Sequence, residues 1–314
     1  MANLYLTHKC NRGCSFCFAR KVLNDGKGHI DDLLSVDEIK QLLEHFPNQF
    51  PEIGLLGGEP FLYPYLDKVL ELLWQYRIIP KIFTSATNPI PVGLAGLDIA
   101  EKPINFVVNI GTRDSYSEEK YANLLRFFSM FHTRSSLSYT IFDLKADTSF
   151  LFDIINQFQL ARTIRVGVAL PIYKGGNQYI KKEDYTTLGK YVVKFAENAS
   201  KQNITLGLDC GFVACMFTTK EIGILQCCGV RASFCCGAAL DIGPGLEAWN
   251  CFPLFQLHKE KALEAENMGE LIKKFRVNMN SYFGGQPGIF EKCGACKHYM
   301  RKTCGGGCKS FKSV

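Results

Sequence analysis

Three cysteines lie close together near the start of the chain. The segment Cys10-Asn-Arg-Gly-Cys14-Ser-Phe-Cys17 has the spacing CxxxCxxC. Thiolates at this spacing can bind three corners of one iron–sulfur cube, whereas a structural zinc or an electron-transfer cluster normally takes a fourth ligand nearby. The next cysteine in the sequence is Cys210. The pattern therefore predicts a cluster in which one iron has no protein ligand and is open to a small molecule.

A second cysteine-rich region occupies the last third of the chain, where 11 of the 14 cysteines lie. Near its end stand two close pairs, Cys293-Gly-Ala-Cys296 and Cys304-Gly-Gly-Gly-Cys308. Upstream, a Gly-rich segment bounded by cysteines at positions 236 and 251 predicts a hairpin. These pairs can bind one or two metal centres or form a structural zinc knuckle. No secretion signal precedes them, so we expect metal ligands or redox groups rather than disulfides.

The stretch between the two groups must form the elements that position them. Its apolar and β-rich runs alternate with segments of helical period, and the clearest helix starts at Ser35, where Glu38 completes a capping box. Six such repeats predict an α/β fold with a parallel sheet, either open and doubly wound or an incomplete barrel. The carboxyl ends of its strands would carry the chemistry. The expected strands are Leu4–Leu6, Ile53–Leu56, Lys81–Thr84, Asn105–Ile110, Leu137–Phe142 and Ile164–Ala169.

Composition limits the class of protein. The 314 residues are 47% hydrophobic and 21% charged, which excludes disorder, and no apolar run is long enough to span a membrane. The formal charge of +6 comes without a basic stripe, so nothing specific points to a nucleic acid. We expect a cytoplasmic protein with no membrane partner. Near residue 203 the sequence changes from alternating strand and helix patterns to short Gly- and Cys-rich segments. This change predicts two domains, 1–203 and 204–314.

The motif at the end of the first strand, with Phe16 before its last cysteine, resembles the radical S-adenosylmethionine (SAM) superfamily. Gly57-Gly58-Glu59-Pro60 follows the second strand, where that family carries the GGE motif that holds the amino group of SAM. The resemblance implies an enzyme with a partial TIM-like (β/α)6 barrel and a [4Fe–4S] cluster whose open iron is chelated by SAM. A reductant such as flavodoxin or ferredoxin would deliver the electron that cleaves SAM to methionine and a 5′-deoxyadenosyl radical, which abstracts hydrogen from a substrate.

The resemblance also implies further SAM contacts. Phe16 would touch the adenine, Asn109 near the end of the fourth strand would reach the ribose, and Leu170 beyond the sixth strand would contact the base. Each also has an ordinary structural interpretation, because strand-end caps and core residues occupy such positions. The GxIxGxxE pattern of some family members is absent from Leu137–Asp143.

The second region resembles the SPASM and twitch extension of radical SAM enzymes, a small cysteine-rich domain that binds one or two auxiliary [4Fe–4S] clusters. By family analogy the inner cluster would take Cys236, Cys251 and Cys308, and the outer cluster Cys293, Cys296 and Cys304. The chain departs from the family because seven residues, not five, separate the second and third of the late cysteines, and a final downstream cysteine is missing. The outer cluster would then have a non-cysteine ligand or be absent.

The sequence does not identify the fourth ligand of the inner cluster. Cys210 and Cys215 follow a strand and could reach substrate, SAM or metal. The candidates for the fourth ligand are Cys210, Cys215, Cys227, Cys228 and Cys235.

Enzymes of the SPASM type most often modify peptides or proteins, so the first hypothesis is oxidation, cross-linking or epimerisation of a peptide or protein residue. The second is oxidation or rearrangement of a small metabolite, and the third is an iron–sulfur scaffold without SAM chemistry. Phe252 stands where sulfatase-maturing enzymes have an aspartate base, which disfavours that activity. Asp143 and Asp209 are weak candidates for a general base. Since the chain begins at strand one, we expect no leader-peptide-binding domain.

Overall fold

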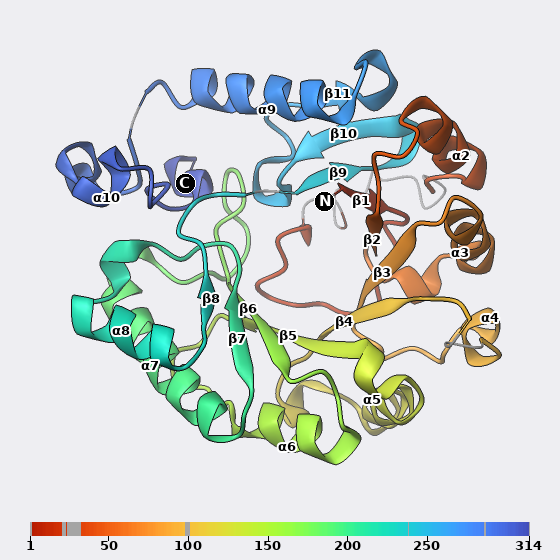
Figure 1. Ribbon diagram of the computed structural model, residues 1–314, viewed down its shortest axis with the longest axis horizontal. Coiled ribbons are helices and arrows are strands. Elements are labelled where there is room, and N and C mark those ends of the chain that lie inside the picture. The colour runs from red at the N-terminus through yellow and green to blue at the C-terminus, as the bar shows by residue number, and fades with distance from the viewer. Residues whose placement is uncertain are drawn as a thin grey trace.

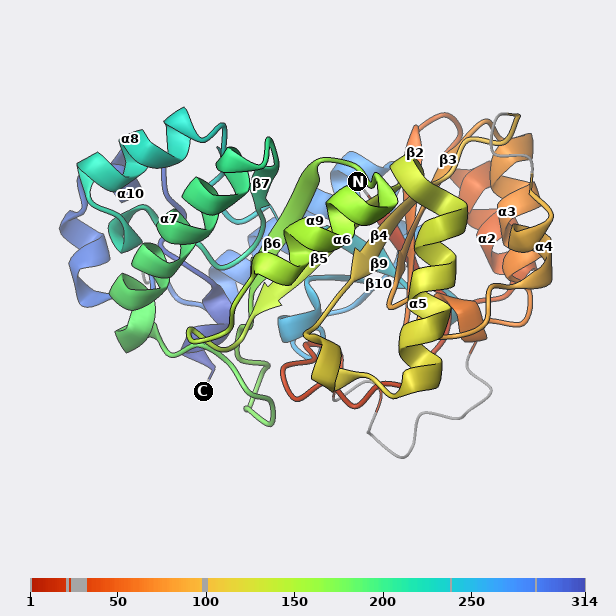
Figure 2. The same cartoon turned by 90° about the horizontal axis from the view of Figure 1, so that it is seen from below.

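The computed structural model describes residues 2–20, 23, 33–97, 101–237, 239–285 and 287–313. Its centre is one curved sheet with helices on the outer side (Figures 1 and 2). The described strands follow one another in the order β11-β10-β9-β1-β2-β3-β4-β5-β6-β7-β8. They are β1 (Ala2–Tyr5), β2 (Glu52–Leu56), β3 (Ile79–Thr84), β4 (Asn105–Asn109), β5 (Ser135–Ile141), β6 (Thr163–Val168), β7 (Thr205–Leu208), β8 (Arg231–Ala232), β9 (Leu240–Ile242), β10 (Glu247–Asn250) and β11 (Glu260–Lys261).

Each of the six expected strands is present, and all of them run parallel. The expected capping box is also present, because the Ser35 hydroxyl accepts the Glu38 N–H while the Glu38 carboxylate accepts the Ser35 N–H. The helices that follow the strands lie outside the sheet in Figure 1. The described helices are α2 (Val36–His45), α3 (Leu66–Gln75), α4 (Val92–Ala95), α5 (Glu118–Phe131), α6 (Ser149–Phe158), α7 (Tyr185–Lys201), α8 (Thr219–Cys227), α9 (Met268–Tyr282) and α10 (Lys297–Met300).

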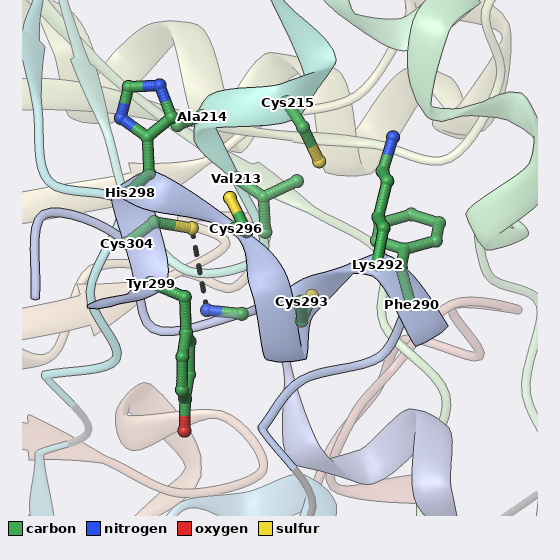
Figure 3. Close-up of a pocket in the computed structure, with 11 residues that line it drawn as sticks. Val213, Ala214, Cys215, Phe290, Lys292, Cys293, Cys296, His298, Tyr299 and Cys304 are labelled. Carbon is green, nitrogen blue, oxygen red and sulfur yellow. Dashed lines mark hydrogen bonds between the residues drawn. The ribbon is translucent and has the colours of Figure 1, made fainter. Parts of the chain in front are cut away.

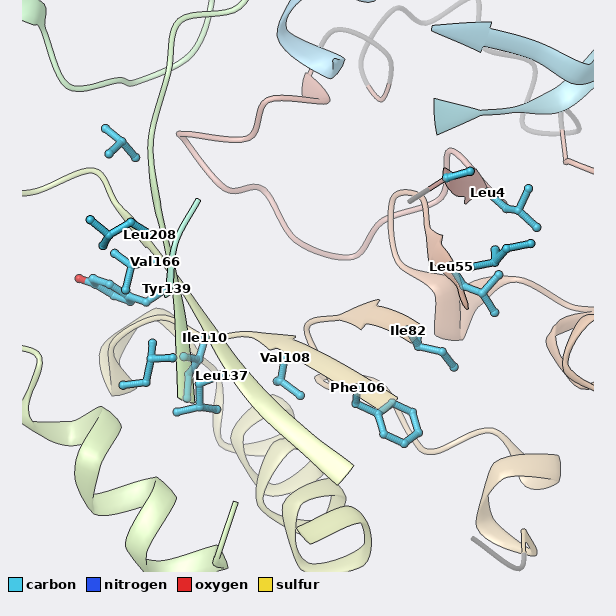
Figure 4. Close-up of a cluster of buried hydrophobic side chains, with 14 of the residues drawn as sticks. Leu4, Leu55, Ile82, Phe106, Val108, Ile110, Leu137, Tyr139, Val166 and Leu208 are labelled. Carbon is cyan, nitrogen blue, oxygen red and sulfur yellow. The ribbon is translucent and has the colours of Figure 1, made fainter. Parts of the chain in front are cut away.

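The core lies between the sheet and these helices (Figure 4). Side chains alternate across a strand, so every second residue of each strand faces the helices. The register aligns them in a buried row that begins Leu4, Leu55, Ile82 and Phe106. Burying such a row against helices is the main source of stability in an α/β fold.

The opposite side of the sheet is polar. Asn3 lies beside Gly54, which lies beside Lys81 in the neighbouring strand. Arg165 on β6 keeps 44% of its side chain exposed and pairs with Asp209, whose side chain is 34% exposed. We call this side the polar face. It is open to solvent at β6 and β7, where this ion pair lies, whereas Asn3 and Tyr5 on β1 are buried.

Strands of the C-terminal region continue the same sheet. β7 pairs parallel with β6, and β9 pairs parallel with β1 at the opposite end of the row. The expected hairpin is formed by β9 and β10, which pair antiparallel. The division into residues 1–203 and 204–314 stays a prediction, but elements on both sides of it share one hydrogen-bonded sheet. No helix in the described part of the chain has the length and apolarity needed to cross a membrane.

Candidate active site

The first cysteine group lies on the loop after β1, at the carboxyl end of the parallel strands. Burial, together with the nearby Cys14 and Cys10 thiols, raises the pKa of the Cys17 thiol to about 11. Such mutual repulsion shows that the three sulfurs are close neighbours. The backbone N–H of Arg12 donates to Cys10 Sγ at 3.4 Å. The loop therefore presents three thiols together and gives at least one of them a donor that favours the thiolate.

The fit of a cluster at this loop can be tested on Tyr5. Its side chain is fully buried, yet its hydroxyl has no hydrogen-bond partner among the residues that the structure describes. Burial raises the pKa of Tyr5, and the charges of Cys17 and Cys10 raise it further, so the hydroxyl lies beside these thiols. A buried donor without a partner is costly. An acceptor such as the sulfide of a bound cluster would satisfy it, and the residues present fit such a group.

The two glycines after β2 allow the cysteine loop to approach. A Cβ on Gly57 would lie 2.7 Å from Thr7 O, and a Cβ on Gly58 would lie 2.9 Å from the Cys10 Cβ and clash with Lys9 O. The N–H of Gly58 donates to Thr7 O at 2.7 Å. These glycines are thus required by the loop that carries the cysteines, in addition to any contact with a ligand.

Glu59 is buried, and its carboxylate is already paired. It accepts hydrogen bonds from Thr84 Oγ1 at 2.5 Å, from the N–H and hydroxyl of Ser85 at 2.8 and 2.6 Å, and from Phe61 N at 3.2 Å. A carboxylate that accepts several hydrogen bonds is held firmly in position. Its carboxylate therefore anchors the end of β3 to the segment after β2, and the backbone of this segment is the part that remains for a ligand.

The expected SAM contacts Phe16 and Leu170 are connected by a residue that sequence reasoning missed. The Asn177 side-chain amide donates to Leu170 O at 2.9 Å and to Phe16 O at 3.4 Å, and its Oδ1 accepts Ile172 N–H at 3.2 Å. Phe16 also stacks on Phe142, with ring centroids 4.5 Å apart. An Asn that bonds nearby backbone groups is a common loop device, but nothing in the local sequence identifies its distant partner.

Asn109 has an exposed side chain at the end of β4, and its carbonyl accepts a hydrogen bond from Arg12. The Arg12 guanidinium lies over the Tyr116 ring, 4.7 Å from its centroid. Arg12 thus connects the cysteine loop to the end of β4, a contact that the sequence did not indicate.

Of the candidate bases, Asp209 pairs with Arg165, and exposed Asp143 accepts the Lys145 N–H at 2.9 Å. Both carboxylates have local partners.

Four thiols of the second region gather near the end of β7. Burial raises the pKa of Cys251 well above its ordinary value, and the thiols of Cys308, Cys236 and Cys210 raise it further. Although the Cys210 residue is exposed, protein around its sulfur raises its pKa to about 12, with Asp209, Cys236 and Cys308 adding to the effect. These four thiols, which we call the inner set, are therefore mutual neighbours.

The backbone of Cys251 has φ +88°, in a region that non-glycine residues seldom adopt. Such a conformation costs of order 1–3 kcal/mol and persists where the surrounding structure requires it. The next residue, Phe252, is buried and packs against Tyr5, with ring centroids 5.2 Å apart. Aromatic packing thus connects the hairpin that carries Cys251 to β1, from which the first cysteine loop departs.

Cys293, Cys296 and Cys304 line a pocket near the C-terminus, and Cys215 lines it as well (Figure 3). The remaining cysteines have other surroundings. Cys235 Sγ donates to Lys302 O at 3.3 Å, and Cys228, at the end of α8, bonds Ser200. No group of three or more His, Cys, Asp or Glu side chains within the described ranges is arranged to hold a single metal ion.

Comparisons with known proteins agree with this geometry. Residues 4–126 match the family model of the radical SAM superfamily. A curated relative, an S-adenosylmethionine-dependent nucleotide dehydratase of Flammeovirga pacifica, is 30% identical over 90 residues, which cover 27% of this chain and 30% of that protein. The chain therefore matches less than a third of that relative's length.

Solved structures of SuiB from Streptococcus suis share the fold. SuiB bound to S-adenosylmethionine matches with a TM-score of 0.70 at 16% identity, covering 98% of this chain and 72% of that one. SuiB bound to the precursor peptide SuiA matches with a TM-score of 0.68 at 16% identity, covering 98% and 71%. The expected α/β fold with a TIM-like parallel sheet and a cysteine-rich C-terminal region is confirmed.

Proposed function

Because this chain carries a radical SAM domain, we propose that it cleaves SAM reductively and uses the resulting radical to modify a residue of a peptide or protein. The observation that carries this proposal is the placement of the cysteine loop and the inner set at the same carboxyl edge of one parallel sheet, with the solvent-open polar face between them. When bound, the first cluster would provide one-electron cleavage of SAM at the iron that Cys10, Cys14 and Cys17 leave free.

The chain's own residues would bind and orient SAM. The backbone after β2, through Gly57 and Gly58, would hold its amino group, since the Glu59 carboxylate is occupied by Thr84 and Ser85. Phe16 and Leu170, connected through Asn177, would flank the adenine. Asn109 has the exposed side chain that a ribose contact needs. Holding SAM against its electron donor removes the entropic cost of an encounter.

The inner set would hold an auxiliary [4Fe–4S] cluster with four thiolates, the usual ligand number for such a cluster. Cys236, Cys251 and Cys308 are the ligands that family analogy suggested, and the position of Cys210 supports it as the fourth ligand over the other candidates. A cluster near the substrate would accept an electron from a product radical, which makes net oxidation of the substrate feasible.

A peptide suits the polar face better than a small metabolite does. Small ligands usually bind in enclosed clefts that bury most of their surface, whereas Arg165 and Asp209 on the polar face stay substantially exposed. Lys81 on β3 and Glu52 on β2 form a second ion pair, with a 2.6 Å contact. SuiB, which shares the fold over 98% of this chain, was solved bound to a precursor peptide.

A nucleotide is the second candidate substrate, because the relative from Flammeovirga pacifica is named a nucleotide dehydratase. A small anionic metabolite could bind at Arg165 on the polar face. This alternative is weaker, since that similarity covers only 27% of the chain.

The test is the production of 5′-deoxyadenosine by anaerobically reconstituted, dithionite-reduced protein. We expect slow cleavage of SAM alone, loss of cleavage in the Cys10/Cys14/Cys17→Ala variant and retention in a Cys227→Ala control. A pool of randomised peptides should stimulate cleavage and contain mass-shifted products, whereas the four ribonucleoside triphosphates should not. Stimulation by a nucleotide alone would favour the second candidate, and no cleavage under any condition would contradict both.

A further inference from the structure

A second group of four thiols surrounds the pocket near the C-terminus (Figure 3). Cys293 lies in the short helical turn Glu291–Ala295, Cys296 directly precedes α10, and Cys304 follows it. Cys215 reaches the same pocket from the turn Ala214–Met216 after β7, far away in the sequence. The four side chains in Figure 3 therefore come from two separate segments and face one space.

Hydrogen-bond donors and a lysine lie around these thiols. The backbone N–H groups of Tyr299 and His298 bond the Cys296 sulfur, and Lys292 lines the pocket with it. Cys304 Sγ accepts the Gly306 N–H at 3.4 Å. Donors and a cation around clustered thiols are the usual setting of metal-bound thiolates.

Tyr185 is an independent sign that a group is bound between the inner set and this pocket. Its side chain is 3% exposed, and its hydroxyl has no hydrogen-bond partner among the described residues. Its ring packs against Phe290, which lines the pocket, and against Phe311, with ring centroids 6.0 and 5.9 Å apart. The ring thus lies between the pocket and the segment after Cys308, where sulfide or thiolate of a bound cluster would accept a hydrogen bond from the hydroxyl.

We propose that Cys215, Cys293, Cys296 and Cys304 form a complete four-thiolate site for a second auxiliary iron–sulfur cluster. Cys215 supplies the fourth thiolate of this site from the loop after β7. Each thiol would release its proton to solvent on binding, so that four thiolates coordinate the cluster. This outer set deepens the proposed function, because it gives an electron accepted at the inner set a second cluster to reach.

Two short segments then serve both sites. The loop after β7 provides Cys210 to the inner set and Cys215 to the outer set, which consists of Cys215, Cys293, Cys296 and Cys304. The Cys304–Cys308 segment does the same, turning at Gly306 and Gly307, whose φ angles are +76° and +92°. Because each loop is anchored at both ends by a cluster, occupancy of one site should help to order the other.

The test counts iron in the full-length chain after anaerobic reconstitution, without any activity assay. Three [4Fe–4S] clusters require about twelve iron atoms per chain. Replacing Cys293, Cys296 and Cys304 by Ala should leave about eight iron atoms, and so should replacing Cys236, Cys251 and Cys308. Adding Cys215→Ala to the Cys293/Cys296/Cys304 variant should leave the iron count unchanged. Adding it to the Cys236/Cys251/Cys308 variant should lower the iron count to about four atoms per chain.

The opposite pattern, in which Cys215→Ala removes iron only from the first triple variant, would assign Cys215 to the inner set and overturn the proposal. So would one zinc per chain in place of the outer iron. Should a triple variant fail to fold, single Cys215→Ala and Cys215→Ser variants are compared by Mössbauer and electron paramagnetic resonance spectroscopy. We expect Ala to change one auxiliary signal and Ser to change it less, with Cys235→Ala as the unchanged control. Unaltered spectra for Cys215→Ala would also overturn the proposal.

Failure of this inference is distinguishable from failure of the proposed function. The effect of added SAM on the spectrum of the first cluster depends on Cys10, Cys14 and Cys17, and it should persist in every Cys215 variant. A protein that never cleaves SAM could still show the expected iron pattern, and one that cleaves SAM could lack it.

Discussion

At the scale of single residues, the site depends on close backbone approaches and on buried polar groups with few partners. Gly58 allows the cysteine loop to lie against the segment after β2, and Glu59 holds that segment in place. Tyr5 and Tyr185 direct buried hydroxyls toward thiols. Small changes at these positions should alter cluster binding before they alter the fold.

Gly58→Ala should displace the first cysteine loop, because the new Cβ would meet Lys9 O and the Cys10 side chain. We expect the iron count to fall by about four atoms, the content of one cluster. Stability should also fall by roughly 1–3 kcal/mol, as is typical of overpacking. Gly13→Ala in the same loop is the matched control, since its Cβ would meet nothing within 4 Å. Equal iron in both variants would contradict this role of Gly58.

Asp241 on β9 should make stability depend on pH. It is 3% exposed, burial raises its pKa to about 7, and it accepts a hydrogen bond from Asn3 Nδ2 at 2.7 Å. Because the folded state binds this proton more tightly than the unfolded state does, the contribution is complete below about pH 4 and is lost as the pH rises through about 7. The Asp241→Asn variant should remove this loss.

The measurement for Asp241 is urea unfolding of the anaerobic holoprotein between pH 4 and 8. At pH 8 the Asn variant should be more stable than the unmodified chain by about 2–4 kcal/mol, from a shift of about three pKa units at 1.36 kcal/mol each. At pH 5.5 about half of this difference should remain, and near pH 4 the two should differ little. Parallel stability curves for the two proteins would show that Asp241 does not titrate as proposed.

At the scale of elements, the loop between β6 and α7 secures the first cysteine loop. Gln178 N–H donates to Ser15 O at 2.9 Å, and Asn177 bonds the carbonyls of Phe16 and Leu170. Hydrogen bonds from one loop to the backbone carbonyls of another hold the second loop in one conformation. The proposed adenine contacts are therefore positioned by a loop outside the recognised motifs.

Asn177→Ala should weaken SAM binding about tenfold, because losing buried hydrogen bonds typically costs 1–3 kcal/mol. Iron in the first cluster should be retained, since no cysteine contact changes. The measurement is SAM affinity by equilibrium dialysis beside the iron count. Ser15→Ala, which removes only an exposed hydrogen bond to Gln178, should change affinity less than twofold. A comparable loss in both variants would point to a general loosening of the loop.

The strands, the capped helix and the cysteine loop were predictable from sequence because each has a local signature. Runs such as Asn105–Ile110 are too apolar to be anything but buried, and Ser35 with Glu38 marks a helix start. The grouping of Cys210 with Cys251, or of Cys215 with Cys293, was not predictable. These contacts join residues far apart in the chain, and spacing carries no information about which loops meet in space.

At the scale of the whole molecule, the sheet connects both cysteine-rich regions mechanically. β9 extends the parallel row beyond β1, while β7 and β8 extend it at the other end. Removing either extension would leave the edge of a long parallel sheet unpaired, which is unfavourable for a folded chain. Shared hydrogen bonding of this kind favours one cooperative unfolding unit over two independent ones.

The two tryptophans of the chain test this coupling, because Trp74 lies on α3 and Trp249 on β10. Trp249→Phe leaves a fluorescent reporter in the N-terminal region, and Trp74→Phe leaves one in the C-terminal region. In each variant we expect the fluorescence midpoint of urea unfolding to coincide with the midpoint from circular dichroism, since β9 cannot separate from β1 without opening the sheet. Each variant is its own control, so a loss of stability on replacing the buried Trp249 does not affect the comparison. If the Trp249 signal changed at clearly lower urea than the circular dichroism, the C-terminal region would unfold by itself, and the sheet would not couple the two groups of clusters.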